Sequence, residues 1–331
     1  MDTYPIAACS LERYYYTDGH QLERQYKEHL SGYEDWEEQK HADKWLVFPD
    51  NIGPNMSIDE TSLSDGELYT VVSNKDAHGR KGALAAIVWG TKAEVVADAL
   101  RNIPLEKRQL VEEITLDLSP SMRSIVQRSF PKTKRTIDRF HIQQLASDAI
   151  QEIRIGHRWE ALKADHKRKL GDPDTGEILP PEIFPNGDSR PQLLARSRYL
   201  LFKSYEKWTD SQKARAKILF HEYPDIKLAY DLAERLKQVF SKCPRRSLAA
   251  TRLAKWYRDV EESGFDSFKV IARTFFDNEQ EILNFFDHRA TNASAESFNA
   301  KIKAFRAQLR GVTDVKYFLF RLQQYFGKFY V

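Results

Sequence analysis

The sequence predicts an α/β fold in which a mixed five-stranded sheet is flanked by helices and interrupted by a large all-helical insertion. Three observations predict it. Three short β-rich runs follow one another between turn residues, which is typical of an antiparallel meander. Two further strand patterns then alternate with helical patterns, as in a sheet that also contains parallel strands. Finally, residues 157–288 carry helical periodicity without a strand pattern, so they cannot continue the sheet.

The strand patterns are short apolar runs that end at glycine, serine, asparagine or aspartate, residues that favour turns. In chain order they are MSIDETSL (56–63), ELYTVVSN (67–74), GALAAIVWG (82–90), EEITLDLS (112–119) and KTKRTIDRF (132–140). Helical spacing appears between the last three strands, in KAEVVADALRNI (92–103) and PSMRSIVQRSF (120–130). Three antiparallel strands followed by helix, strand, helix and strand is the order of an RNase H-like sheet.

These patterns divide the chain into four parts. Residues 1–50 are acidic and rich in aromatic side chains, and we expect a helical N-terminal segment there. Residues 51–156 are predicted to form the first part of the RNase H-like core, and residues 157–288 the helical insertion. Residues 289–331 are predicted to return to the core as helices.

The net charge of +3 hides an uneven distribution of charge. Residues 1–50 contain 5 Lys and Arg against 11 Asp and Glu, whereas residues 121–170 contain 12 against 5 and residues 191–260 contain 16 against 7. Such basic clusters indicate a polyanionic partner, although solvated helix faces give the same pattern. With neither a basic, apolar leader nor a long apolar run, the sequence predicts a cytoplasmic protein. Cys9 and Cys243 are too far apart for a zinc ribbon or a disulfide framework.

Asp117 is the first candidate functional residue. Ile114, Leu116 and Leu118 alternate with polar residues, as in a strand with one buried face. Ser119 and Pro120 then have the residue types of an N-cap and a first helical position, which leaves Asp117 without an evident structural role. Ligands in open α/β sheets bind at the carboxyl ends of strands. Asp117 is therefore a candidate ligand, the alternative being a solvated strand end.

Two further carboxylates complete the candidate set. Asp59 lies in the first strand, which neighbours the strand of Asp117 in an RNase H-like sheet, and Glu60 beside it is equally plausible on its residue type. Glu296 begins a helical pattern and is predicted to share one face of that helix with Asn299, Lys303, Arg306 and Arg310. A glutamate in a first helical turn is also favoured by the helix dipole without any function.

Four blocks of the sequence together resemble a known family. SIDETSL, TLDLSPSMRSIVQRSFP, DRFHI and NASAESFNAKIKAFR occur in the order and spacing of the catalytic blocks of DDE-type insertion-sequence transposases, in the group typified by the ISL-three element. The resemblance runs from about residue 45 to the carboxyl end. It implies an RNase H-like catalytic core in which Asp59, Asp117 and Glu296 hold two Mg²⁺ or Mn²⁺ ions. Asp138 and His141 resemble a nearby signature of related groups, and a purely structural role for them is equally plausible.

The resemblance further implies metal-dependent cleavage of DNA at insertion-sequence ends, followed by strand transfer into target DNA. Arg139, Asn299, Lys303, Arg306 and Arg310 are the residues expected to contact DNA. The family's N-terminal zinc-binding and helix-turn-helix segment is not visible. We therefore expect a separate DNA-recognition polypeptide, or a second copy of the chain in a homodimer, to dock on residues 1–50. The alternatives are an RNase H-like nuclease without strand transfer and an inactive transposase-derived nucleic-acid-binding protein.

Overall fold

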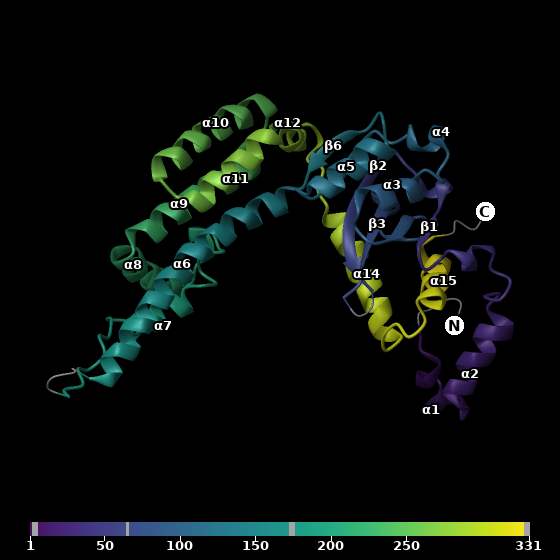
Figure 1. Ribbon diagram of the computed structural model, residues 1–331, viewed down its shortest axis with the longest axis horizontal. Helices are drawn as coiled ribbons and strands as arrows, with labels where there is room; N and C mark the ends of the chain where they lie inside the picture. Colours follow the sequence, from purple (N-terminus) through teal and green to yellow (C-terminus); the bar gives the residue numbers. More distant parts are fainter. Residues whose placement is uncertain (2–5, 64–65, 172–175, 328–331) are drawn as a thin grey trace. The chain divides into compact units, whose positions relative to one another are not determined.

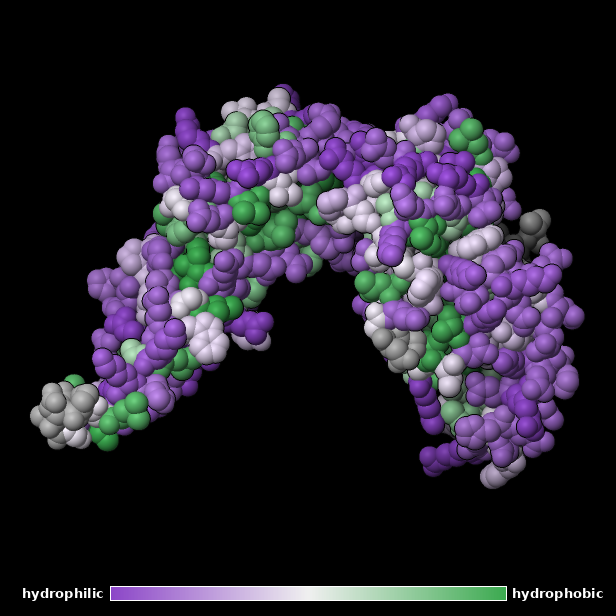
Figure 2. Space-filling model, in the orientation of Figure 1, coloured by the Kyte–Doolittle hydropathy of each residue, from purple (hydrophilic) through white to green (hydrophobic). Residues whose placement is uncertain are grey.

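The computed structural model describes residues 1, 6–63, 66–171 and 176–327. The chain forms two compact units, which are shown in Figure 1. One consists of residues 1–138 and 288–331, and the other of residues 139–287. Hydrophilic side chains cover most of the surface visible in Figure 2, with scattered apolar areas. Within the described residues, every helix is too short or too polar to cross a bilayer.

The first unit is built on a six-stranded sheet with the order β1-β4-β3-β2-β5-β6. β2, β3 and β4 are antiparallel, whereas β5 runs parallel to both β2 and β6. The five predicted strands are therefore present in the RNase H-like order, and the α/β fold is confirmed. The strand bounds are β1 Trp45–Val47, β2 Asn55–Ser62, β3 Leu68–Asn74, β4 Leu84–Trp89, β5 Glu113–Leu116 and β6 Lys134–Ile137.

The predicted number of five strands is wrong, because β1 adds a sixth at the free edge of β4. β1 pairs antiparallel with β4 through three residues, from Trp45 opposite Val88 to Val47 opposite Ala86. A strand of three residues is too short to show a period of two in the sequence. Its presence depends on pairing with a strand about 40 residues away, which local sequence does not encode.

One face of the sheet is covered by α3 (Ala93–Leu100) and α5 (Pro120–Ser129). Ile58, Ile114 and Leu116 point to this face and pack with apolar residues of both helices. The short helix α4 (Leu105–Arg108) lies between α3 and β5 in the sequence. α5 begins where the sequence predicts, with Pro120 as its first residue and Ser119 at the N-cap position. The Ser119 side chain does not make a capping hydrogen bond, so that part of the prediction is wrong.

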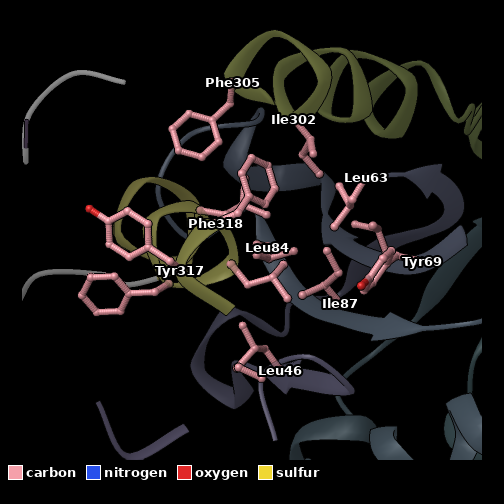
Figure 3. Packing of buried hydrophobic residues seen from close by; sticks show 14 of the residues in the cluster. Leu46, Leu63, Tyr69, Leu84, Ile87, Ile302, Phe305, Tyr317 and Phe318 are labelled. Carbon is pink, nitrogen blue, oxygen red and sulfur yellow. The ribbon is translucent and has the colours of Figure 1, made fainter. Parts of the chain in front are cut away.

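The opposite face is covered by α14 (Ala293–Gln308) and α15 (Val315–Phe326), whose apolar side chains pack on the sheet as shown in Figure 3. Phe298, Ile302 and Phe305 of α14 are buried at the helical spacing that the sequence predicts. This burial fixes which side of α14 faces away from the apolar cluster, and therefore where Glu296 and Asn299 are presented.

The N-terminal segment packs against α15 in the same apolar cluster. It contains α1 (Glu12–Tyr15), α2 (Gly19–Gln25) and a π-helical turn from Tyr26 to Leu30. The rings of Tyr33 and Trp36 lie 5.3 and 5.2 Å from the ring of Phe320, centroid to centroid. Part of the aromatic content of residues 1–50 is therefore core material of this unit.

The second unit is entirely helical apart from an isolated bridge between Ile183 and Ser189, within the residues that the structure describes. α6 packs against α7, α9 and α11, and α9 packs against α10. The predicted boundary between residues 156 and 157 falls inside α6, because the helix runs unbroken from Arg139. The helices are α6 Arg139–Leu170, α7 Arg190–Arg196, α8 Asp210–Glu222, α9 Pro224–Lys242, α10 Arg246–Ser263, α11 Asp266–Asp277, α12 Glu279–Leu283 and α13 Phe285–His288.

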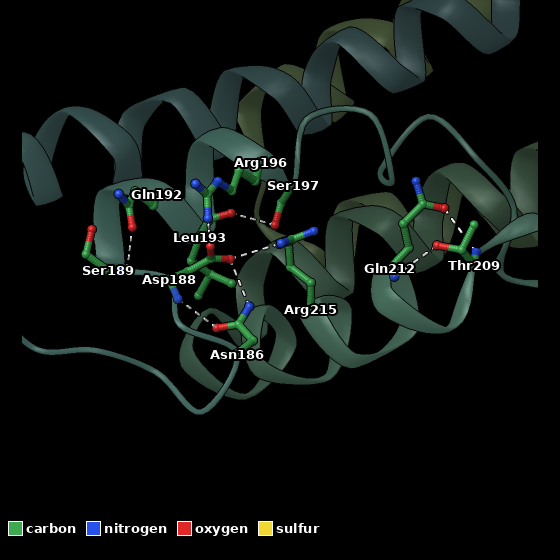
Figure 4. A network of polar contacts seen from close by, with 10 residues as sticks. All are labelled: Asn186, Asp188, Ser189, Gln192, Leu193, Arg196, Ser197, Thr209, Gln212 and Arg215. Carbon is green, nitrogen blue, oxygen red and sulfur yellow. Dashed lines mark hydrogen bonds and ion pairs between the residues drawn. The ribbon is translucent and has the colours of Figure 1, made fainter.

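A buried aspartate ties α7 to α8 in this unit, as Figure 4 shows. The side chain of Asp188 is fully buried and accepts hydrogen bonds from Arg196 of α7 and from Nε of Arg215 of α8, the latter at 2.9 Å. Asn186 donates a further bond of 2.8 Å to the same carboxylate. The start of α8 is closed by a capping box in which Thr209 and Gln212 each bond the other's backbone N–H.

Candidate active site

Three aspartates occupy equivalent positions on three neighbouring strands, Asp59 within β2 and Asp117 and Asp138 just after β5 and β6. In the parallel part of the sheet, Ser57 of β2 pairs with Thr115 of β5, which pairs with Thr136 of β6. The next positions on the same side are two residues further along each strand, and they hold Asp59, Asp117 and Asp138. The backbone N–H of Asp138 still donates to the carbonyl of Leu116 at 2.9 Å, so the pairing continues to this level. We call these three residues the aspartate row.

α14 is attached to the aspartate row by two asparagines. The side-chain amide of Asn292 donates to Oδ1 of Asp117 at 3.1 Å, and its backbone N–H donates to Oδ1 of Asp138 at 3.2 Å. Two helical turns later, the amide of Asn299 donates to Oδ2 of Asp59 at 2.6 Å. Asn292 is 1% exposed and Asn299 is 6% exposed. Each aspartate of the row therefore accepts a hydrogen bond from one of these two residues.

Glu296 lies between the two asparagines on α14, four residues after Asn292 and three before Asn299. This spacing places all three on one face of the helix. Carboxylate oxygens of Glu296 and Asp138 lie within 4.8 Å of each other. Asp59, Asp117 and Glu296 do not together meet that spacing among the described residues. The structure thus brings Glu296 to the aspartate row at its Asp138 end.

The remaining predicted signature residue, His141, is the third residue of α6. It follows Asp138 by three residues, which is close to one helical turn, and its side chain is half-buried. In the sequence, His141 is therefore the closest residue to Asp138 among the histidines, cysteines, aspartates and glutamates, whose side chains are able to bind a metal ion. Asp138 itself is 1% exposed, which distinguishes it from an ordinary solvated strand end.

The site concentrates negative charge. Glu60, the alternative to Asp59 in the sequence, is half-buried, and its backbone N–H donates to Oδ1 of Asp59 at 2.8 Å. Burial, and then the negative charge of Asp117, raise the pKa of the Glu60 carboxyl above its ordinary value. A carboxyl group whose pKa is raised by burial and by a neighbouring carboxylate marks a place where a cation would be stabilised.

A half-buried lysine contacts the strand of Asp117 next to the aspartate row. Nζ of Lys75 donates to Oγ1 of Thr115 at 2.7 Å, one pleat before Asp117 on the same side of the sheet. Burial lowers the pKa of Lys75, and the nearby carboxylates of Glu113, Asp76 and Asp138 oppose that effect. Sequence reasoning missed Lys75 because nothing in the turn that contains it signals contact with β5, 40 residues later.

The donor set fits a hard divalent cation. Carboxylate and amide oxygens are the protein ligands that Mg²⁺ and Mn²⁺ take. Besides the carboxylates, the amide oxygens of Asn292 and Asn299 are buried and have no hydrogen-bond partner among the described residues. An unsatisfied buried carbonyl oxygen is costly, and a cation is one means of satisfying it.

The residues predicted to contact DNA occupy different settings. Arg139 is exposed at the first position of α6, while Lys303 and Arg310 are exposed in or just after α14, and Arg306 is half-buried. Asn299 instead lies in the site, bonded to Asp59. Sequence reasoning missed Asn292, whose bonds to Asp138 and Asp117 cross 154 and 175 residues.

Comparisons with known proteins identify the family. Residues 56–322 match the model of the family described as "Transposase", the DDE type of the ISL3 element. The transposase for insertion sequence element IS1557 of Mycobacterium tuberculosis, from strains CDC 1551 and H37Rv, is 25% identical over 251 residues. That match covers 75% of this chain and 54% of the relative, so the chain spans about half the length of the curated relatives.

Among solved structures, the chain is similar to the Drosophila P element transposase strand transfer complex, with 12% identity and a TM-score of 0.32. That similarity covers 82% of this chain and 77% of the other. The family model covers well over half of the chain, and its span includes the strands of the aspartate row and α14. The chain belongs to the ISL3-type family of DDE transposases.

Proposed function

We propose that this chain is the catalytic part of a DNA transposase that cuts DNA at insertion-sequence ends and joins the cut ends to target DNA. The observation that supports this proposal most strongly is the aspartate row with α14 bound along it. Asp59 of β2 and the aspartates that follow β5 and β6 are aligned at the carboxyl edge of the parallel strands, where ligands of α/β sheets bind, and Glu296 of α14 lies at the Asp138 end of this row. The sequence places most of these residues far apart, so their meeting is a property of the fold.

We assign cation binding to Asp59, Asp117 and Glu296, with Asp138 and His141 as neighbouring ligands. Paired Mg²⁺ or Mn²⁺ ions activate the attacking oxygen and stabilise the leaving oxygen of an in-line displacement at phosphorus. Asn292 and Asn299 hold the carboxylates in place, since each amide is buried and bonded to the row. Lys75 offsets part of the negative charge that these carboxylates bring together.

The substrates in this proposal are the terminal repeats of an insertion sequence and a target DNA. Water attacks in the cleavage step and the freed 3′ hydroxyl attacks in strand transfer. Like other transposases, the protein is proposed to act as a homodimer that bridges two DNA ends, in the bacterial cytoplasm on the nucleoid. A separate DNA-recognition polypeptide that docks on residues 1–50 is also part of the proposal. Arg139, Lys303, Arg306 and Arg310 are proposed to bind phosphates.

A strand-transfer assay with precut, labelled insertion-sequence ends and supercoiled target DNA tests the function. We expect Mg²⁺-dependent joining by the wild type. Asp59→Asn, Asp117→Asn and Glu296→Gln should each reduce it at least about 10³-fold, because each removes a ligand charge. Asp98→Asn, an exposed aspartate of α3 bonded to Arg101, is the matched control and should leave joining unchanged.

Two results would contradict the proposal. Cleavage of uncut ends without any joining of precut ends would make the protein a nuclease. Joining that persists in all three carboxylate variants at the wild-type rate would place the reaction elsewhere in the chain.

A further inference from the structure

A basic groove lies between α9 and α10 in the helical unit, away from the residues assigned above. The two helices pack side by side, as Figure 1 also shows. The groove has a volume of about 320 Å³. Its lining includes four cationic side chains and one carboxylate, a net charge of +3, and comprises Arg235, Gln238, Val239, Lys242, Arg252, Lys255, Trp256 and Asp259.

The charges in the groove are not evenly compensated. At one end, Arg235 donates to Oδ2 of Asp259 at 2.6 Å, so that pair is neutral. Lys242, Arg252 and Lys255 are exposed and have no ion-pair or hydrogen-bond partner among the described residues. The groove therefore carries three uncompensated cations, one from α9 and two from α10, and we call these three residues the cationic end of the groove. Like charges that line one groove repel one another unless an anion joins them.

We propose that the cationic end binds the phosphodiester backbone of DNA, an inference that rests on the proposed function and extends it to the helical unit. The groove falls within residues 191–260, a basic cluster with 16 Lys and Arg against 7 Asp and Glu. The buried indole N–H of Trp256 is not available to a ligand, because it donates to the carbonyl of Leu232 at 2.9 Å. Cations over an apolar floor bind charge without reading bases.

The number of charges in the groove suits phosphate binding. Lys242, Arg252 and Lys255 all line it, and each cation can neutralise one phosphate of a DNA strand. The chemistry predicts affinity that depends strongly on salt and weakly on sequence.

Fluorescence anisotropy of the full-length chain with a labelled duplex of random sequence, in EDTA, tests this inference without requiring catalysis. The variant Lys242→Ala/Arg252→Ala/Lys255→Ala should bind roughly tenfold or more weakly at about 0.1 M salt. Its plot of log affinity against log salt should be less steep by about 2.7, since each lost phosphate contact removes about 0.9.

The matched control is Lys217→Ala/Arg258→Ala/Arg273→Ala, which removes the same charge from exposed positions of α8, α10 and α11 outside the groove. We expect its salt slope to stay close to that of the wild type. Circular dichroism checks that both variants keep their helices. Equal slopes for the two variants would overturn the inference, because the effect would then be one of net charge alone.

A third result would also overturn it. If the groove variant binds DNA as the wild type does but loses self-association in sedimentation, the occupant is an acidic surface of a second copy. A result against DNA binding by the groove is distinguishable from a result against the proposed transposase function. A groove variant with normal DNA binding leaves the strand-transfer result untouched, and a chain without strand transfer can still show groove-dependent binding.

Discussion

Asn292 connects the start of α14 to two aspartates of the aspartate row. Its side chain bonds Asp117 and its backbone bonds Asp138, so it fixes the start of α14 against two strands at once. Asn299 does the same for Asp59 two turns later. Hydrogen bonds to charged carboxylates contribute about 1.5–3 kcal/mol each, and they keep like charges in place that would otherwise repel. Glu296 is positioned between these two anchors.

Replacing Asn292 by alanine should therefore destabilise the first unit more in EDTA than in Mn²⁺. The substitution removes the amide donor to Asp117 but keeps the backbone bond to Asp138. We expect a loss of about 1.5–3 kcal/mol without a cation, and a smaller loss when Mn²⁺ supplies the positive charge in place of the amide. Thermal or urea unfolding under both conditions measures the difference.

Asn51→Ala is the matched control for this prediction. Asn51 is also buried in the first unit, but its amide donates to the backbone carbonyl of Leu84 at 2.7 Å and is bonded to no carboxylate. Its loss should lower stability equally with and without Mn²⁺. If Asn292→Ala behaves like Asn51→Ala, the amide has a structural role only.

The residues of the site differ in how far the sequence predicts them. Asp117 stands out because a charged side chain lies at the carboxyl end of a strand pattern, whereas Asp59 is predicted from the expected pairing of its strand with the strand of Asp117. The neighbouring strands required by that prediction are present, since β2 pairs with β5. Asn292 carries no such signal, because an asparagine before a helix is an ordinary N-cap type. Its contacts arise only when the last part of the chain returns to the sheet.

At the scale of elements, local periodicity predicts five of the six strands of the sheet but not the edge strand β1. The five longer strand patterns and the two helices between them correspond to β2–β6, α3 and α5. β1 escapes prediction because its three residues depend on β4 for pairing. Ser119 illustrates a similar limit. Its residue type marks the start of α5 correctly, although its hydroxyl does not cap the helix.

The link between α7 and α8 gives a prediction about pH. Burial by itself would raise the pKa of Asp188, but the guanidinium groups of Arg215 and Arg196 outweigh it and hold that pKa below the ordinary value of 3.8. A lowered folded-state pKa adds stability above the unfolded pKa, and that stability is lost as the pH falls through the folded pKa. The carboxylate therefore stabilises the helical unit at neutral pH.

Asp188→Asn should cost about 2–4 kcal/mol at pH 7, because it leaves two arginines without their shared carboxylate. The difference from the wild type should shrink as the pH falls from 3.8 through the lower pKa of the folded carboxyl, where the wild-type side chain also becomes neutral. Urea unfolding followed by circular dichroism at several pH values measures it. Asp210→Asn, an exposed partner of Lys213, is the control and should change stability by less than about 0.5 kcal/mol. A pH-independent cost for Asp188→Asn would contradict the assignment.

At the scale of the whole molecule, the uneven charge of the chain follows its two units. The acidic N-terminal segment packs on α15 of the first unit through Tyr26, Tyr33 and Trp36, while the cationic end of the groove belongs to the second unit. Among the described residues of this segment, Tyr14, Tyr15 and Tyr16 are 72–95% exposed and therefore available to a partner. We propose that a partner that docks on residues 1–50 contacts these three side chains.

We propose that carboxylates from three neighbouring strands and from α14 hold divalent cations at one site. Diffraction from crystals of this chain grown with Mn²⁺, with data collected at the manganese absorption edge, tests it directly. We expect anomalous peaks within about 2.5 Å of carboxylate oxygens of Asp59, Asp117 and Glu296. Mn²⁺ bound only at other acidic residues, with these three carboxylates unliganded, would contradict it.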